Sequence, residues 1–232
     1  MRNCCFLLFC LFLSTTIQAQ KLEFFSDVNF GIPLNSSLKD FHNELADQVP
    51  YENFKTTDNF KYNYGFTTGM RFNRKISVFF SNKVSGAKSS VADYSGYIRL
   101  TNELKGYTFG AKYEIIINQY TKGNLLLGFK GLVTSSKLSL KTESKIENTT
   151  ENSGIDFKSL DFGTGVGITY EYPLNFMVLR AYLDLDIYVG GKIKLEEDTS
   201  NDGYLMTNNG GKVTTGWSGF NAGIGIAIPI VK

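Results

Sequence analysis

Cysteine is scarce in this chain of 232 residues, and histidine is scarcer still. The three cysteines, Cys4, Cys5 and Cys10, all fall within the first twenty residues, so the rest of the chain has no thiol. This absence excludes disulfides, thiolate metal sites and cysteine nucleophiles from residues 21–232. The single histidine, His42, leaves a thin inventory for acid–base catalysis.

An excess of charge of one sign is also lacking. The chain has 24 basic and 22 acidic residues, and removal of Arg2 with an N-terminal signal leaves 23 basic residues and a net charge of about +1. The basic clusters are no longer than residues 73–75. Proteins that bind nucleic acid usually carry a basic patch, so we expect no nucleic-acid partner.

Residues 1–20 have the features of a secretory signal peptide. Arg2 supplies a positive charge, residues 4–13 form an unbroken apolar run, and residues 14–20 are a more polar exit. The apolar run is too short to span a bilayer as a helix. We therefore expect residues 1–20 to be cleaved and residues 21–232 to form one domain.

Long hydrophobic runs are missing after the signal, and a period of two replaces them. From Phe60 to Phe72, aromatic and apolar residues alternate with polar residues and glycine, which predicts a β-strand with two chemically different faces. Seven further segments show the same alternation, three of them less cleanly. The eight predicted strands are 22–34, 60–72, 76–85, 107–117, 125–135, 160–170, 179–189 and 220–230.

The predicted connections alternate between long and short. The short ones are 73–75, 118–124 and 172–175, and the long ones are 35–59, 86–105, 136–156 and 192–213. Long loops on one rim and tight turns on the other are typical of outer-membrane barrels. Aromatic residues near the ends of the apolar faces suit interfacial girdles, and polar faces that mix glycine with charge suit a narrow lumen.

These observations predict an all-β protein: an eight-stranded antiparallel up-and-down transmembrane β-barrel with long extracellular loops and short periplasmic turns. Closure is required in lipid, because an open sheet edge would leave backbone groups unpaired. A soluble lipocalin-like barrel that binds an apolar ligand is the rival at the level of fold. It would turn its apolar faces inward instead of outward.

The segments 60–72, 160–189 and 216–231 together resemble small outer-membrane β-barrel domain proteins of the OmpA/OmpX-like kind. The resemblance implies residence in the cell outer membrane, contact with outer-membrane lipid and insertion by the barrel-assembly machinery. That machinery usually reads a C-terminal aromatic residue, whereas this chain ends Ile230-Val231-Lys232.

A barrel of about eight strands is just wide enough for side chains to fill it, so we expect a plugged lumen. Charged residues of both signs occupy the polar faces of the predicted strands. If these faces line the lumen, the buried charges would have to pair. The predicted lumen charges are Lys61, Arg71, Lys112, Glu114, Lys130, Asp161, Glu171, Arg180, Asp184 and Asp186. A narrow channel along the same charges is the alternative.

Small lumen residues are expected to face large ones across strand pairs. The turn at 73–75 places Gly69 opposite Phe79 and Gly65 opposite Lys83. A turn at 172–175 would place three glycines beside large side chains of the next strand. These pairs are Gly163 with Asp184, Gly165 with Tyr182, and Gly167 with Arg180.

Catalysis has one candidate constellation, in which His42 would activate a serine as in a lipid-modifying enzyme. The residues available to it are Ser36, Asp40, His42, Asp93 and Ser95. The simpler interpretation is a solvated histidine on a short helix, because Leu38, Phe41 and Leu45 recur at helical spacing and Ser37 with Asp40 resembles a capping start. We favour the simpler interpretation and expect no enzyme.

From the sequence we expect no cofactor and no metal site. Residues 198–203 have the opening spacing of a calcium loop, but Asn209 stands where a bidentate glutamate is needed, so we expect a solvated acidic loop. The predicted function is a structural or surface-interaction barrel, with a possible extracellular ligand at the long loops.

Overall fold

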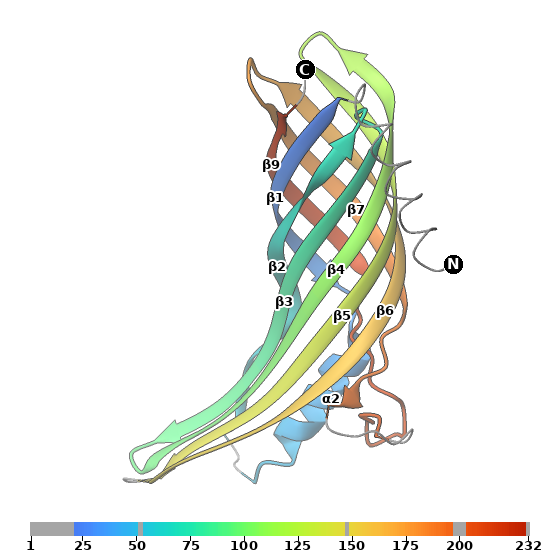
Figure 1. Ribbon diagram of the computed structural model, residues 1–232. Helices are drawn as coiled ribbons and strands as arrows, with labels where there is room; N and C mark the ends of the chain where they lie inside the picture. The colour runs from blue at the N-terminus through green and yellow to red at the C-terminus, as the bar shows by residue number, and fades with distance from the viewer. Residues whose placement is uncertain (1–20, 51–52, 147–148, 197–202, 231–232) are drawn as a thin grey trace, which may run out of the picture.

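The computed structural model describes residues 21–50, 53–146, 149–196 and 203–230. The predicted signal and residues 198–202 of the acidic loop lie outside this part of the chain. The described residues form an all-β barrel with one helix (Figure 1). Its elements are β1 (Leu22–Pro33), α2 (Ser36–Asp47), β2 (Lys55–Phe72), β3 (Ile76–Asp93), β4 (Gly96–Tyr120), β5 (Gly123–Ile146), β6 (Thr149–Pro173), β7 (Val178–Gly190), β8 (Lys194–Leu195) and β9 (Gly219–Pro229).

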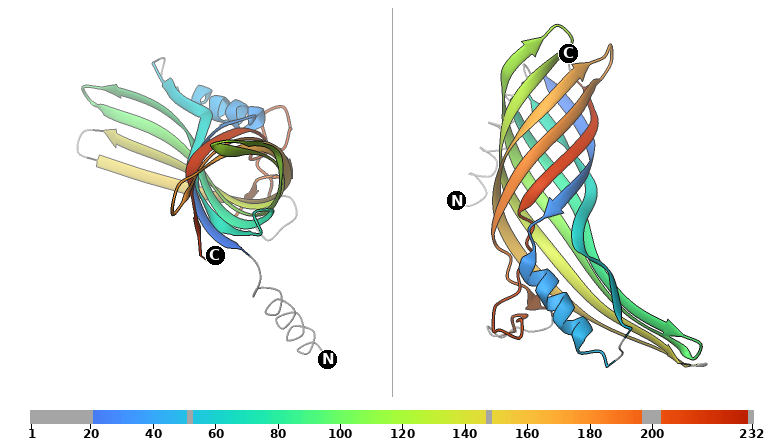
Figure 2. Two further views of the ribbon diagram at one scale, coloured as in Figure 1. Left: turned by 90° about the horizontal axis from the view of Figure 1, so that it is seen from above. Right: turned by 180° about the vertical axis from the view of Figure 1, so that it is seen from behind.

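Eight of the strands close into a ring. Each strand from β1 to β6 pairs antiparallel with the next, β7 pairs with β9, and β9 pairs with β1. The two-residue strand β8 pairs only with β6. The ring is evident when the molecule is seen along its axis (Figure 2). The predicted up-and-down barrel of eight strands is therefore confirmed.

Tight turns join the strands at one end of the ring. The β2–β3 turn has positive φ at Asn73 (51°) and Arg74 (57°), and Lys75 donates its amide to the Phe72 carbonyl at 3.0 Å. Two central residues of positive φ match the twist of the flanking strands, which explains so short a connection. The β4–β5 and β6–β7 connections lie at the same end, as predicted.

The opposite end differs from the prediction, because two of the four long loops are strand. Residues 86–93, 96–105, 136–146 and 149–156 continue β3, β4, β5 and β6 into a curved sheet that extends beyond the ring (Figure 1). The period of two persists there, but the apolar set changes sides. Leu104 and Leu138 face inward, whereas Lys105 and Lys137 take the outward positions.

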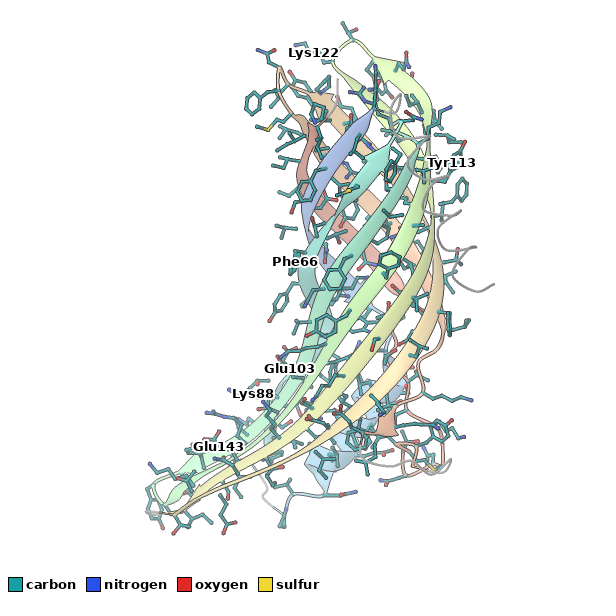
Figure 3. All side chains as sticks on the ribbon, in the orientation of Figure 1. Phe66, Lys88, Glu103, Tyr113, Lys122 and Glu143 are labelled. Carbon is teal, nitrogen blue, oxygen red and sulfur yellow. The ribbon has the colours of Figure 1, made fainter. Side chains whose placement is uncertain are left out.

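The outward side chains of the ring are apolar, and the lumen is polar. Tyr64 is 63% exposed and Phe66 47%, whereas Arg180 and Asp184 are each 4% exposed. Figure 3 shows Phe66 and Tyr113 on the outer surface of the ring, and Lys88, Glu103 and Glu143 on the sheet extension. This orientation is the reverse of that in a lipocalin-like barrel.

A β-bulge between Asn59 and Asn63 breaks the predicted alternation of β2. Phe60, with φ of 47°, is fully buried instead of facing outward. Lys61 is exposed and does not join the lumen charges, contrary to the sequence-based expectation. Residues 60–62 of β2 stand opposite the single residue Gly86 of β3, so the alternation of side-chain directions is lost within the bulge.

Helix α2 lies at the end of the ring away from the tight turns (Figure 1). Its apolar face packs into a core that closes this end of the barrel. The buried members of the core are Leu38, Phe41, Phe60, Ala87, Leu104, Leu138, Phe157, Ile193, Val213 and Trp217. In the described part of the chain, no helix combines the length and the apolar character needed to cross a membrane.

Candidate functional site: the charged lumen

The first lumen cluster surrounds Arg71 near the tight-turn end. Arg71 lies directly opposite Glu23 across the β1–β2 pair and donates Nε to Glu23 Oε2 at 2.9 Å. The same guanidinium pairs with Glu171 and lies 3.5 Å from Glu114 Oε2. Arg71 is fully buried, so its charge depends on these carboxylates.

Arg180 and Lys112 extend this cluster across the lumen. Arg180 lies opposite Glu171 across the β6–β7 pair, and its Nη1 is 3.5 Å from Asp27 Oδ2. Lys112 Nζ lies 2.9 Å from Glu114 Oε1. Glu114 and Glu171 therefore each contact more than one cation, which links charges from five strands into one network.

A second cluster lies around Lys130. Its Nζ is 2.6 Å from Asp186 Oδ1 and 3.0 Å from Asp184 Oδ2. Lys83 Nζ lies 3.7 Å from Asp186 Oδ2, and Asn221 Nδ2 donates to the same oxygen at 3.0 Å. Charges of both signs are again paired inside the barrel.

Glycines provide the space for these side chains. A Cβ at Gly165 would lie 2.2 Å from Asp186 Oδ1, and one at Gly163 would lie 2.6 Å from the Tyr188 ring. Such contacts are too short for any side chain, so each glycine accommodates a specific large neighbour. Small and large residues thus alternate around the lumen, as the sequence predicted.

The predicted partners of the β6 glycines are wrong, whereas those of β2 are confirmed. Gly69 faces Phe79 and Gly65 faces Lys83. In β6, however, Gly163 faces Tyr188, Gly165 faces Asp186 and Gly167 faces Asp184, because the turn occupies residues 174–177 instead of 172–175. Its closing bond runs from the Leu174 amide to the Met177 carbonyl at 2.7 Å. Tyr182 and Arg180 consequently face Thr169 and Glu171.

An apolar and hydroxyl-rich layer closes the lumen toward α2. Asp161 Oδ1 accepts the Thr215 hydroxyl at 2.6 Å, and its other oxygen accepts Ser136 at 3.3 Å. Trp217 Nε1 donates to Ser136 Oγ at 2.8 Å. The cavity that remains in the lumen is about 50 Å³, which is room for a few water molecules.

Nine of the ten lumen charges predicted from sequence lie in the barrel interior, and Lys61 does not. Sequence reasoning missed Glu23 and Asp27, and it placed Lys83 opposite Gly65 without counting it among the lumen charges. Their signal was present, since Glu23 and Asp27 alternate with the outward residues Phe24 and Val28 of β1. The alternation is less clean in β1 and in β3, because the large apolar residues Phe25 and Phe79 face inward.

His42 belongs to a separate buried site beneath α2. Its Nε2 lies 2.9 Å from Ser89 Oγ, and its Nδ1 lies 2.8 Å from Asn102 Nδ2. Thr56 Oγ1 lies 2.8 Å from the same Ser89 hydroxyl. The predicted solvated histidine is therefore wrong: the helix exists, but His42 is fully buried and joins α2 to β2, β3 and β4.

The predicted catalytic constellation does not assemble around His42. Ser36 and Asp40 are exposed on α2, and Asp93 binds Ser95 in the turn at the tip of the β3–β4 hairpin. Ser37, the predicted cap, contacts Thr214, and Asn35 occupies the N-cap position. Leu38 and Phe41 are buried, as their spacing predicted.

The Ser89–His42–Asn102 cluster is arranged as a structural link. Both ring nitrogens of His42 are engaged, Nδ1 with the Asn102 side-chain amide and Nε2 with the Ser89 hydroxyl, and these contacts tie α2 to β3 and β4. Burial also lowers the pKa of His42 to about 4, so the ring is neutral near pH 7.

Comparison of the chain with protein-family models gives no match, and a search of curated protein sequences gives none either.

Proposed function

We propose that this protein is an OmpA/OmpX-like β-barrel of the cell outer membrane, with a lumen filled by paired charges and a structural or surface-interaction role. The single observation that carries the proposal is the outward apolar band around the ring. In a water-soluble barrel this surface would be an unusually large exposed apolar patch. In a bilayer it would be solvated by lipid.

The band has the height of a bilayer core. On β6, the outward positions from Leu160 to Tyr172 are apolar or threonine. At ~3.3 Å per residue this stretch is about 40 Å long, and a strand tilt of about 45° reduces it to about 28 Å along the barrel axis. The hydrocarbon core of a bilayer is about 30 Å thick.

The band gives way to charged residues within two rows of the sheet. Phe80, Phe109, Val133 and Phe162 lie side by side in register on four strands. Two rows further from the tight turns, the outward positions of β4, β5 and β6 are all lysine. These lysines are Lys105, Lys137 and Lys158. The change from aromatic to cationic side chains supports a membrane boundary at this height.

The filled lumen supports a closed barrel over the narrow-channel alternative. Arg71 and Lys130 are each held by two carboxylates or more, and the core beneath α2 closes one end. Moving ions through this network would require several buried pairs to separate. We expect the purified protein to show no steady single-channel conductance in a planar bilayer, and reproducible conductance steps would contradict the filled lumen.

The proposal is tested by cell fractionation together with heat-modifiable gel mobility. The mature protein should fractionate with outer membranes, resist extraction at high pH, and migrate faster unheated than boiled in detergent. The boiled sample and a known periplasmic protein are the controls. Recovery in the soluble periplasmic or extracellular fraction, with no mobility shift, would favour a soluble barrel.

The surface-interaction role is assigned to the sheet extension of β3, β4, β5 and β6. Its outward face carries mixed charges, including the pairs Arg99–Glu143 and Lys137–Asp156. No catalytic role is proposed for His42. Replacing His42 by Ala should leave the lipid A species of whole cells unchanged, and a changed profile that matches a gene deletion would contradict this assignment.

A further inference from the structure

A groove on the outer surface of the barrel gathers lysines from two parts of the chain. Its volume is about 530 Å³, and it lies between the outward face of β6 and the segment that follows β7. Lys158 comes from β6, and Lys192 and Lys194 come from the following segment. Tyr204, Leu160 and Ser135 also line the groove.

The lysines stand close together although their charges repel. Lys158 is directly opposite Lys194 across the β6–β8 pair and directly opposite Lys137 across the β5–β6 pair. Like charges at directly opposed positions destabilise a sheet. Lys137 is compensated by Asp156 at 2.8 Å and Glu196 at 3.3 Å. In the described residues, no carboxylate lies within 4.0 Å of the Lys158, Lys192 or Lys194 ammonium groups.

Tyr204 holds two cations at the side of the groove. Lys194 Nζ lies 4.5 Å from the centre of the Tyr204 ring, and Lys212 Nζ lies 3.9 Å from it. The aromatic face partly offsets the cationic charge and fixes the positions of both ammonium groups. The groove therefore holds several closely spaced ammonium groups, and a bound anion would reduce their mutual repulsion.

The groove is continuous with the apolar band. Leu160 lines its floor and is the last apolar outward residue of β6 before Lys158. Val189, 68% exposed, precedes the lining residue Gly190 on the neighbouring strand. An amphiphile that lies against Leu160 and Val189 would place its polar end at the lysines.

We propose that this groove binds the phosphate headgroup of an anionic membrane lipid, with Lys158, Lys192 and Lys194 as the phosphate ligands and the acyl chains along Leu160 and Val189. The inference rests on the proposed membrane insertion of the barrel. Lysines at the edge of an apolar band attract anionic lipid by charge and retain it by apolar contact.

The test measures the selectivity of the inserted barrel for a phosphate-bearing lipid. The protein is reconstituted in phosphatidylcholine vesicles that contain spin-labelled phosphatidic acid or spin-labelled phosphatidylcholine, and the relative association constant of the two labels is compared. The groove variant carries Lys158→Gln, Lys192→Gln and Lys194→Gln. The matched control carries Lys88→Gln, Lys141→Gln and Lys145→Gln, which remove equal charge from the sheet extension.

The full chain should prefer phosphatidic acid, and the groove variant should lose this preference by about tenfold or more, since each lysine near an anionic surface adds to binding. The control variant should keep it. An unchanged preference in the groove variant, or an equal loss in both variants, overturns the proposal. Displacement of the label by millimolar inorganic phosphate would also overturn it, because the site would then bind free anions instead of lipid.

Heat-modifiable mobility of the same vesicles separates this proposal from the one on which it rests. A barrel that inserts but shows no preference for phosphatidic acid refutes only the lipid groove. A chain that fails to insert refutes the membrane barrel, and the lipid groove with it.

Discussion

Arg71 is the residue on which the lumen network depends most directly. Arg71→Gln would leave Glu23, Glu171 and Glu114 without their central cation. We expect the free energy of unfolding to fall by about 3–5 kcal/mol, the usual cost of breaking a buried ion pair. Urea unfolding followed by fluorescence of Trp217, the chain's single tryptophan, measures the change.

Arg74 provides the matched control for Arg71. It also binds Glu23, at 2.8 Å, but its side chain is 44% exposed. Arg74→Gln should cost at most about 1 kcal/mol, because solvent screens an exposed pair. Equal losses in the two variants would show that the burial of Arg71 does not decide its contribution.

Gly163 tests the packing of small against large residues in the lumen. Gly163→Ala should destabilise the barrel by about 1–3 kcal/mol, because the added methyl group would overlap the Tyr188 ring. In a Tyr188→Ala background the same change should cost much less, as a double-mutant cycle would show. The control is Gly131→Ala, since a Cβ at Gly131 meets no atom within 4 Å. A similar loss in Gly131→Ala would contradict the packing argument.

His42, which joins helix α2 to the barrel, is a titratable group. In the folded protein burial lowers the pKa of His42 to about 4, although nearby Asp58 acts in the opposite direction. In the unfolded chain the ring takes up a proton below about pH 6.5. The stability that neutral His42 contributes is thus complete above pH 6.5 and is lost as the pH falls toward 4, by roughly 3 kcal/mol in total.

Hydrogen exchange of the α2 amides measures this dependence. Protection factors in α2 should fall between pH 6.5 and pH 4 in the natural sequence, and they should stay nearly constant in His42→Gln. The amides of β4 near Phe109 serve as the internal reference. A parallel loss of protection in both proteins would assign the effect to other groups.

Several strands and one register were predictable from sequence, and the predictions that were wrong failed for physical reasons. The β2–β3 register followed from a short turn of fixed geometry, whereas the β6–β7 register depended on which four residues form the turn. The sheet extension was missed because its apolar residues, such as Leu104 and Leu138, exchange faces with the charged ones. Ser89 and Asn102 could not be assigned to His42, because contacts between distant strands leave no local spacing in a sequence.

At the scale of the whole molecule, the proposed membrane insertion depends on the outward apolar band around the ring. Val166 lies outward near the middle of the apolar band on β6, and Asn152 lies outward on the same strand in the extension. Val166→Arg should reduce the free energy of unfolding in phospholipid vesicles by about 2–4 kcal/mol. Asn152→Arg should change it by no more than about 0.5 kcal/mol. Equal effects, measured by urea titration, would argue that the band does not meet hydrocarbon.

The fold class and the polarity of the two faces were accessible from the alternation alone, because a period of two leaves a signal in every strand. The proposed groove was not, since Lys158 and Lys192 lie on separate segments whose approach depends on the β6–β7 register and on the pairing of β8 with β6.

The two long hairpins, β3–β4 and β5–β6, have a consequence for how the protein reaches its final position. Asp93 and Ser95 form the turn of the β3–β4 hairpin, and Glu143 and Lys145 lie near the far end of β5. On the proposed placement, both tips start on the side of the chain termini and finish on the far side of the bilayer. On that placement, the charged hairpin ends have to cross the apolar core of the bilayer, where an unpaired charge is costly to desolvate.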